Sequence, residues 1–459
     1  MCAGGGAGGD PPDTGDAACD GPPDGGGDTA GDGPSEAGAP RLLGCRRVRS
    51  HCAGVRRRLL GGLPPEVGAL AGVAFCVALG FGILAPALPV FARSFGVSAF
   101  AATTVISVFA LMRLVSSPGA GWLVNTLGER SVLATGLGIV ALSSLLAGFA
   151  QSFAWLLVLR GAGGIGSAMF TVSAFALLLR VVAPEQRGRA AGTFQAGFLF
   201  GGIAGPALGG LVVGWSLRAP FFVYAATLVA AVAVTLVMLT HTQLRDDTGV
   251  AEQSAEATGL RAALRDRAYR AALAVNFGNG MVSFGLRTAL VPLFVVESLR
   301  SGPSLAGAGF LLGAAAQAVL LVPAGRSADH RGRRPVMIGG SILLLAGMLT
   351  LSLSSGPVVF LLAMLVLGGS AACLGSAPAA VVGDVVGGRR RGVAIAAYQM
   401  ASDVGTIVGP LVAGLLADSV GYGWAFFAGA VVAVVTVALT TTMPETLRRT
   451  PPTPVPASG

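Results

Sequence analysis

The sequence has no lysine, only three histidines and few charged residues of any kind. Charged residues make up 12% of its 459 positions, where about 25% is typical of a soluble domain. Hydrophobic residues make up 53%, and the mean hydropathy is +0.74. So few charges could hardly cover a soluble globule of this length, whereas a surface in contact with lipid does not need them. The composition therefore predicts a membrane protein.

The scarcity of reactive side chains also argues against several kinds of site. The three histidines lie outside the centres of the apolar segments, so an intramembrane enzyme would lack a cluster of nucleophile, base or metal ligands. Four of the six cysteines lie in the polar N-terminal region, and Cys76 and Cys373 lie in apolar segments with no CxxC or Cys/His cluster. No G-x-x-x-x-G-K-[ST] motif for nucleotide phosphates is present. We therefore expect a protein that is not an enzyme and needs neither a metal nor another cofactor.

All 31 basic residues are arginine, and the net charge is +9. Such an excess can indicate a nucleic-acid partner. Here, however, most arginines fall in short loops between apolar segments, where they orient a membrane protein. The sequence therefore predicts contact with a lipid bilayer and no nucleic-acid partner.

The N-terminal region differs sharply from the rest. Residues 1–40 contain seven Asp, one Glu and no basic residue, and residues 41–58 contain seven Arg. This composition cannot bury a core and predicts a disordered tail, which is either a regulatory arm or the product of a wrongly assigned start site. The predicted organisation is a cytoplasmic tail at 1–65, a six-helix bundle at 66–240, a central cytoplasmic loop at 241–271, a second six-helix bundle at 272–442 and a disordered tail at 443–459.

Twelve apolar segments follow, each long enough for the ~20 residues of helix that cross a bilayer. A polar interval divides them six and six, so we expect an all-α membrane protein of twelve transmembrane helices. The predicted spans are 69–92, 100–122, 132–151, 153–177, 190–214, 219–240, 272–296, 304–325, 335–354, 357–380, 393–416 and 423–442.

Arginines gather in the loops that follow the second, fourth, sixth, eighth and tenth spans. The opposite loops hold little beyond Arg93, Arg218 and Arg300. By the positive-inside rule, the first set of loops is cytoplasmic, and so are both termini. The expected location is the plasma membrane, crossed many times.

The two halves repeat one pattern at a fixed offset. The stretches GWLVNTLGER (121–130) and GRSADHRGRR (325–334) are 204 residues apart, and GGIAGPALGG (201–210) and GTIVGPLVAG (405–414) keep the same offset. A register shared by separate segments indicates an internal repeat. Two similar bundles can rock against each other around a site near the bilayer midplane, which is the machinery of alternating access.

At these residues the chain resembles the major facilitator superfamily over about 69–442. The second loop is similar to the superfamily's loop signature, whereas the first departs from it, with Asn125 where Asp is usual and Glu129 where Arg is usual. The first cytoplasmic latch should therefore be weaker or different, and Asp329 is expected to hold the cytoplasmic side closed near Arg187 and Arg189. The residues assigned to these gating loops are Gly121, Asn125, Gly128, Arg130, Gly325, Asp329, Gly332, Arg333 and Arg334.

Further signatures lie within the spans. FGILAPALP, in the first span, resembles the family's first-helix signature, and RGAGGIGSA (160–168) resembles its fourth-helix signature. The Gly-rich stretch 192–210 resembles the fifth-helix signature of drug/proton antiporters, which implies export. Small residues let helices approach closely in lipid, and a proline allows a kink or hinge. The packing and hinge residues are Pro86, Pro89, Gly192, Gly201, Gly205, Pro206, Gly209, Gly210, Gly409 and Pro410.

Charges deep in a span are rare and are functional candidates by default. Asp403 is the only carboxylate that we place well inside a span, and it either binds and releases a proton or forms a fixed ion pair with an arginine. Arg160 matches the fourth-helix signature, which the resemblance links to proton transfer or cavity electrostatics. Arg113 and Arg287 either line the cavity and favour anionic substrates or bind helix carbonyls. The repeat-related Gln195 and Gln399 are expected to line the cavity as well.

The resemblance thus implies a secondary transporter that exports drugs or small organic metabolites in exchange for protons, with the proton gradient as its energy source. A monomer is sufficient for this mechanism. A proton-coupled importer or a metabolite facilitator on the same fold is the alternative within transport. A non-transporting sensor or membrane enzyme is the alternative outside it, but the central loop of about 30 residues is too short to add an ordinary soluble domain.

Overall fold

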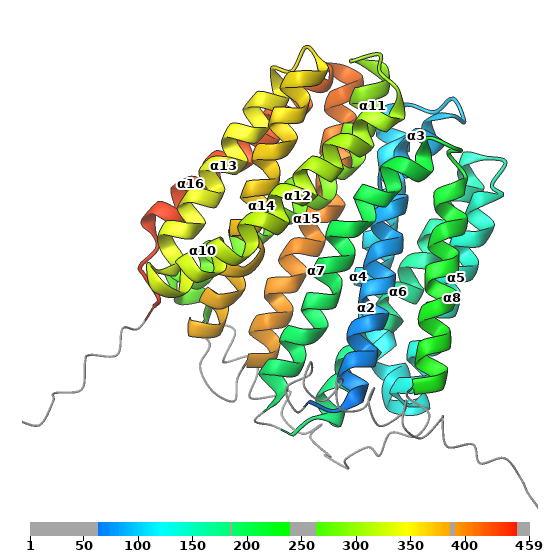
Figure 1. The fold of residues 1–459 in the computed structure, drawn as a ribbon, viewed down its shortest axis with the longest axis vertical. Coiled ribbons are helices and arrows are strands. Elements are labelled where there is room, and N and C mark those ends of the chain that lie inside the picture. The colour runs from blue at the N-terminus through cyan, green and yellow to red at the C-terminus, as the bar shows by residue number, and fades with distance from the viewer. Residues whose placement is uncertain (1–62, 184–185, 239–262, 386–390, 448–459) are drawn as a thin grey trace, which may run out of the picture. The chain divides into compact units, whose positions relative to one another are not determined.

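The computed structural model describes residues 63–183, 186–238, 263–385 and 391–447, and every described helix lies in one compact unit, residues 55–459. The described residues are almost entirely helical (Figure 1). The first half contains α2 (Pro65–Leu84), α3 (Leu88–Arg93), α4 (Ala99–Leu127), α5 (Glu129–Gly148), α6 (Phe153–Val181), α7 (Arg187–Val213) and α8 (Ala219–Met238). The second half contains α10 (Arg267–Asn279), the π-helix η2 (Gly280–Leu286), α11 (Arg287–Glu297), α12 (Pro303–His330), α13 (Arg333–Ser352), α14 (Pro357–Val385), α15 (Arg391–Ser419) and α16 (Tyr422–Thr442).

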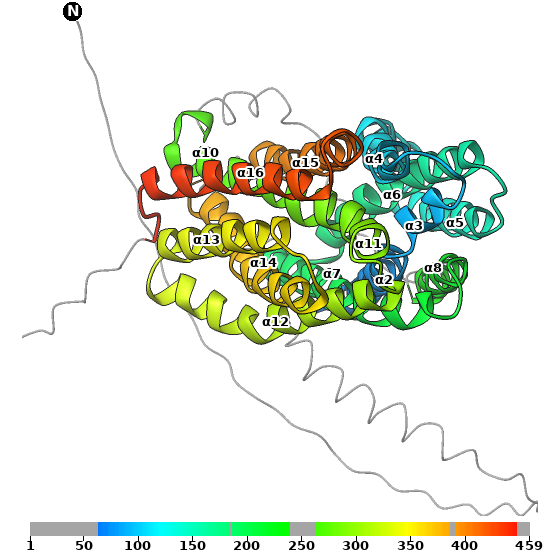
Figure 2. The same cartoon turned by 90° about the horizontal axis from the view of Figure 1, so that it is seen from above.

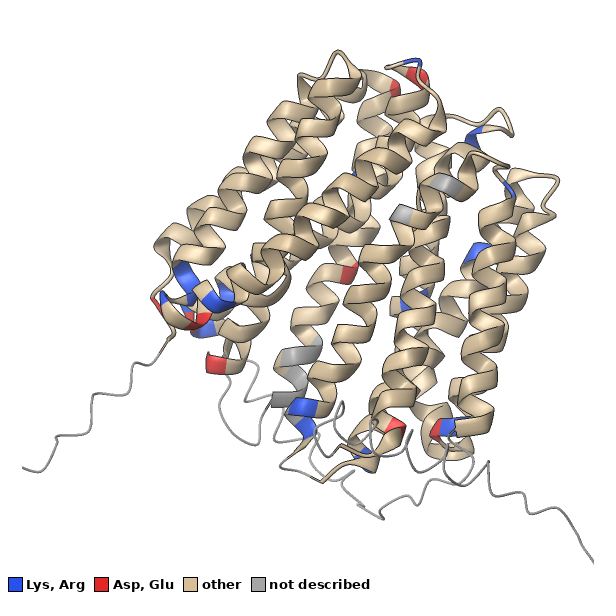
Figure 3. Ribbon diagram, viewed as in Figure 1, with Lys and Arg blue, Asp and Glu red and all other residues tan. Residues whose placement is uncertain are grey.

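Each of the twelve predicted spans falls on helix in the described residues, and the predicted fold class is confirmed. Among the described residues, eleven helical segments are long and apolar enough to cross a membrane, and α7 accounts for the remaining span. Arginine and acidic residues lie mainly toward the two ends of the helices (Figure 3), as lipid contact along their middle requires.

Three details differ from the predicted boundaries. The first span is divided by a turn at residues 85–87, where Pro86 separates α2 from α3. The seventh span includes η2, and its helix begins at Arg267, inside the predicted loop 241–271. Most of the two predicted tails and of that loop lies outside the described residues.

The repeat seen in the sequence is present in the helices themselves. Adding 204 to the bounds of α5 and α6 gives those of α13 and α14, residue for residue. Figures 1 and 2 show the helices of each half lying side by side. α11 makes smaller contacts with α3 and α4, and the most extensive contacts between the halves are formed by two helix pairs, α4 with α15 and α7 with α12. We call them the α4–α15 seam and the α7–α12 seam.

The Gly-rich stretch of α7 is a packing surface. Gly197, Gly201, Gly205 and Gly209, four residues apart, all face the backbone of α2. A Cβ added at Gly201 would lie 2.5 Å from the carbonyl oxygen of Phe75, and the other three would lie 2.2–2.7 Å from such oxygens. Without a hydrophobic drive between helices in lipid, this close approach is what holds α7 to α2.

These glycines mostly bind α7 to its own half, so they are not chiefly a sliding surface between the bundles. Only Gly210 of the predicted set meets the other half, where its Cβ would lie 2.5 Å from the Cα of Gly307. The second half repeats the arrangement, since Gly405 and Gly409 face α10 and η2. At Gly192, by contrast, nothing lies within 4 Å of an added Cβ.

The prolines occupy positions that helices tolerate at a cost. Pro206 lies inside α7, where its ring is 2.7 Å from the Cβ position of Gly82. Pro410 lies inside α15 and its ring is 2.9 Å from the Cβ position of Gly285. Pro89 is the second residue of α3, where a missing backbone N–H is harmless.

We expect Gly201→Ala to destabilise the protein and Gly202→Ala, its neighbour, to leave it unchanged or slightly more stable. The first added methyl group meets the Phe75 carbonyl, which costs about 1–3 kcal/mol in overpacking. The second meets nothing within 4 Å and gains helix propensity. The thermal unfolding midpoint of the purified protein in detergent measures both, and equal midpoints would contradict the packing role of Gly201.

Candidate functional site

The α4–α15 seam brings together two charges that the sequence placed 290 residues apart. The Nη2 atom of Arg113 on α4 donates a hydrogen bond to Oδ1 of Asp403 on α15. Their side chains are 32% and 25% exposed, so the pair is not sealed inside the protein. A proton or a substrate group can therefore reach a carboxylate that joins the two halves.

Contacts between α4 and α15 continue from this pair to the N-terminal end of α4. Ser107 donates to the carbonyl oxygen of Ile407 over 2.8 Å. An added Cβ at Gly414 would lie 2.3 Å from Thr103, one turn further on. Finally, the Asp418 carboxylate accepts from the N–H groups of Ala99 and Phe100 at 3.0 and 2.8 Å, at the positive end of the α4 dipole.

An ion pair between repeat-related residues lies at the same end. Nε of Arg93 donates to Oε1 of Glu297 over 2.6 Å, and the two residues are 204 positions apart. The Tyr422 hydroxyl donates to the other carboxylate oxygen over 2.6 Å. Residues related by the repeat thus face each other with opposite charge. We call this end of the molecule, marked by Arg93, Glu297 and Asp418, the closed end.

Apolar packing reinforces the closed end. Ala289 and Leu293, which belong to α11 in the second half, are part of the buried core of the first half and are 0% and 1% exposed. The α7–α12 seam adds the backbone contact of Gly210 with Gly307. The offset of 204 relates this contact to the one between Gly414 and Thr103 on the other seam.

Arg160 and Arg287 form no ion pair with a described carboxylate. Arg160 is 1% exposed, its guanidinium carbon lies 4.4 Å from the Phe109 ring centroid, and its Nε and Nη1 atoms have no hydrogen-bond partner. Arg287 lies 5.9 Å from the Phe310 ring centroid, and its Nε atom is also without a partner. A cation–π contact compensates only part of the desolvation of a buried charge. The interior therefore contains two positive charges that no described carboxylate neutralises.

The predicted cavity glutamines occupy equivalent places in the two halves. Gln195 lies on α7 and Gln399 lies on α15, and both side chains are exposed. Gln399 is one turn before Asp403, so the two side chains share a helix face.

The two signature loops lie at the end opposite the closed end, and we call it the signature end. In the first loop, Gly128 joins α4 to α5 with φ of 80°, and the buried Glu129 accepts from Nη1 of Arg180 over 2.6 Å. Gly332 holds the matching position with φ of 120°. Both turns need the left-handed backbone that glycine alone adopts without strain. The remaining first-loop residues are Gly121 and Arg130, which are half-buried, and Asn125, which is exposed.

The second loop has an ion pair equivalent to that of Glu129 with Arg180, but with the charges exchanged. Arg333 lies 3.4 Å from Asp384, and these positions correspond to Glu129 and Arg180 at the offset of 204. Arg333 also donates to Asp329, whose side chain is 67% exposed. Asp329 thus pairs within its own loop, and its expected contact with the beginning of α7 stays a prediction. At Gly325 nothing lies within 4 Å of an added Cβ.

The segment after α16 binds the start of α13. The Glu445 carboxylate accepts from the N–H groups of Arg333 and Arg334 at 2.8 and 3.0 Å, and Nη2 of Arg334 donates to the carbonyl oxygen of Thr441. Partial burial raises the pKa of the Glu445 carboxyl, but its backbone hydrogen bonds outweigh burial and hold the pKa below its ordinary value. The carboxylate thus satisfies N–H groups that the first turn of a helix leaves free.

Sequence reasoning missed the groups of the closed end and Asp384. They lie near helix termini, where a charge is ordinary and draws no attention. The repeat offset contained a usable signal, because it relates Arg93 to Glu297 and Glu129 to Arg333, each with opposite charge.

Comparisons with known proteins agree with this architecture. A family model described as Major Facilitator Superfamily matches residues 70–289 and again residues 272–458. Multidrug resistance protein 2 of Bacillus subtilis (strain 168) is 30% identical over 165 residues, which are 36% of this chain and 41% of that protein. Quinolone resistance protein NorA of Staphylococcus aureus is 27% identical over 165 residues, 36% of this chain and 42% of that protein. The chain therefore aligns with less than half the length of these relatives.

Solved structures share the fold at low identity. A bacterial homolog of the human lysosomal transporter Spinster, inward-facing and unoccupied, superposes with a TM-score of 0.67 at 14% identity, covering 82% of this chain and 95% of that one. The nucleoside transporter NupG gives 0.63 at 15% identity, with 82% and 99% covered. The human organic anion transporter MFSD10 (TETRAN) gives 0.60 at 18% identity, with 82% and 100% covered.

The closed end yields a charge-exchange prediction. Glu297→Arg places two arginines face to face and leaves the Tyr422 hydroxyl without its acceptor, so we expect the halves to separate at this end. The double variant Arg93→Glu/Glu297→Arg restores an ion pair and should restore most of the closure. Electron spin resonance distances between labels at Ser216 and Ser354, in a background without native cysteines, measure the separation. Identical distances in the wild type and the single variant would contradict the role of this pair.

Proposed function

The chain belongs to the major facilitator superfamily, and on this premise we propose that it is a secondary exporter that exchanges a small organic molecule for protons. The observation that carries the proposal is the ion pair between Arg113 and Asp403, which joins the two halves and remains accessible. Protonation of Asp403 would cancel the negative charge of this ion pair. Proton binding and contact between the halves would then depend on one carboxyl group.

The positions of the contacts suggest which stage of the cycle the structure represents. We assign the signature end to the cytoplasm, because arginines are concentrated in its loops. The closed end then faces outward, and the molecule is closed to the outside. In this inward-facing stage Asp403 has released its proton and pairs with Arg113, and a substrate binds from the cytoplasm.

In the outward-facing stage the contacts of the closed end are broken. Asp403 then takes up a proton from outside, its attraction for Arg113 falls, and the substrate is released. One proton that moves inward across 100 mV supplies about 2.3 kcal/mol from the potential alone. Neither a nucleotide nor a second copy of the chain is needed for this cycle.

Both the relatives and the interior charges support a direction and a substrate class. Multidrug resistance protein 2 and quinolone resistance protein NorA are named for resistance, which favours export over import. The incompletely paired guanidinium groups of Arg160 and Arg287 favour a substrate with a carboxylate or another anionic group. Import on the same fold is the second candidate, which the departures from the loop signature at Asn125 and Glu129 leave open.

We expect Asp403→Asn to abolish compound-driven proton movement. The amide cannot take up a proton in the physiological range, although it can still accept a hydrogen bond from Arg113. Inverted membrane vesicles that contain a pH-sensitive dye, with an imposed proton gradient, report proton release when a panel of carboxylates and their esters is added. Asp266→Asn is the matched control, because Asp266 caps α10 and asparagine caps a helix equally well.

Proton movement that is triggered by a compound in the wild type and in Asp266→Asn, but not in Asp403→Asn, would support the exchanger. Movement that survives in Asp403→Asn would keep the exchanger but remove Asp403 from its coupling. Equilibration of radiolabelled compounds without proton movement would replace the exporter by a facilitator. A larger response to the esters than to the carboxylates would overturn the anionic substrate class.

A further inference from the structure

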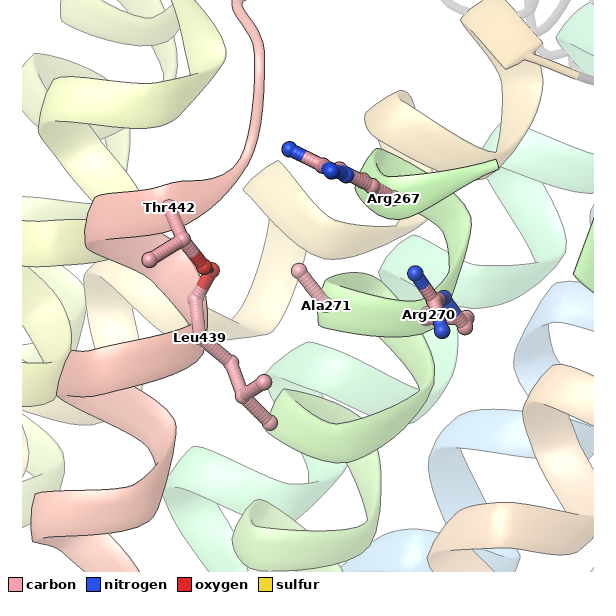
Figure 4. Close-up of a pocket in the computed structure, with 5 residues that line it drawn as sticks. All are labelled: Arg267, Arg270, Ala271, Leu439 and Thr442. Atoms are coloured by element: carbon pink, nitrogen blue, oxygen red, sulfur yellow. Dashed lines mark hydrogen bonds between the residues drawn. The ribbon is translucent and has the colours of Figure 1, made fainter. Parts of the chain in front are cut away.

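A small pocket lies between α10 and α16 at the signature end, away from the interior site. It is lined by Arg267, Arg270 and Ala271 from the first turns of α10, and by Leu439 and Thr442 from the last turns of α16. In Figure 4, Arg267 and Ala271 extend from α10 toward Leu439 and Thr442, and Arg270 lies on the side of α10 away from them. The pocket thus combines two cationic side chains with an aliphatic wall at the end of two membrane-spanning helices.

The two arginines have no ion-pair partner among the described residues. Both are exposed, and neither forms a salt bridge in this part of the chain. The adjacent carboxylate, Asp266, is occupied as the cap of α10, where it accepts from the N–H groups of Ala268 and Tyr269 at 2.7 and 3.3 Å. A third cation, Arg334, donates to the carbonyl oxygen of Thr441, next to the pocket wall. The Glu445 carboxylate already accepts from the backbone N–H of Arg334, so Arg267 and Arg270 are the cations that remain for an anion.

A continuous apolar stripe runs along α16 away from the pocket. Its members are four residues apart and share one helix face. They lie within ~18 Å of helix at a rise of 1.5 Å per residue, and a free inorganic anion would have no use for such a surface. The stripe consists of Phe427, Val431, Val435 and Leu439, which are 42%, 50%, 52% and 37% exposed.

We propose that this pocket binds the phosphate of an anionic phospholipid, with an acyl chain along the α16 stripe. Arg267 and Arg270 supply charge-assisted hydrogen bonds to the phosphate oxygens. Leu439, at the junction of pocket and stripe, contacts the part of the lipid where headgroup meets chain. Basic pockets between transmembrane helices on the cytoplasmic side suit such headgroups. The site is independent of the transport cycle proposed above, since none of its residues contacts Arg113 or Asp403.

The test is native mass spectrometry of the full chain in detergent, titrated with phosphatidylglycerol or phosphatidylcholine. We expect the wild type to bind phosphatidylglycerol more tightly. The double variant Arg267→Gln/Arg270→Gln should bind it about 25-fold more weakly, as follows from about fivefold for each juxtamembrane arginine. Arg265→Gln is the matched control, since Arg265 is exposed, lies two residues from Arg267 and does not line the pocket.

Each arm of the titration decides a different point. Equal binding of the two lipids by the wild type, or an equal loss in Arg265→Gln, would overturn the proposal in favour of diffuse attraction to positive charge. Displacement of the lipid by equimolar glycerol 3-phosphate would make the pocket a site for a soluble phosphate. The single variants Arg267→Gln and Arg270→Gln, each expected to bind about fivefold more weakly, keep the test decisive where the double variant does not fold. Binding is measured without transport, so failure here is distinct from failure of the proposed exchanger.

Discussion

Close contact between helix backbones is the constraint on which the rest of this structure depends. Lipid is as apolar as the helices themselves, so burial alone does not hold one helix to another. Gly197, Gly201, Gly205 and Gly209 allow α7 to lie directly against the carbonyl oxygens of α2, and Gly405 and Gly409 do the same for α15. Each half thereby becomes a unit whose inner helices are fixed, and such units can move against one another without being rebuilt.

The repeat conserves this backbone geometry within the chain but does not conserve charge. Glu129 pairs with Arg180 in the first half, and the equivalent positions in the second half are Arg333 and Asp384, with the signs exchanged. Either order of charges links the start of one helix to the end of the next, so the ion pair requires only that its partners differ in sign. Arg93 and Glu297 use the same freedom differently, because equivalent positions can meet across the two halves only when their charges are opposite.

Hydropathy and the offset of 204 residues were sufficient to predict the twelve helices and their division into halves, and the resemblance of the signature motifs indicated the family. These features follow from local composition, which a single sequence contains in full. Asp403 and Arg113 could be recognised as unusual, since a charge inside a span is costly wherever it lies. An ion pair of Asp403 with an arginine was one of two predictions, but the choice of Arg113 could not be predicted, because it depends on which helices of the two halves are adjacent. The roles of Asp418 and Tyr422 could not be predicted for the same reason. Asp418 binds the N-terminus of α4, and Tyr422 donates to Glu297 on α11.

The α4–α15 seam and the α7–α12 seam have similar backbone contacts but different charges. This difference affects how a proton that binds Asp403 could change the contact between the halves. The offset of 204 places Leu199 at the position equivalent to Asp403 and Gln317 at the position equivalent to Arg113. The α7–α12 seam therefore has the glycine contact at Gly210 but no equivalent of the ion pair. If protonation of Asp403 weakens the attraction to Arg113, it does so on one seam only, while the other keeps its close contact. In the proposed cycle, an unequal response of this kind would turn a change of a single charge into a rotation of one half against the other, which a symmetric pair of charges would oppose.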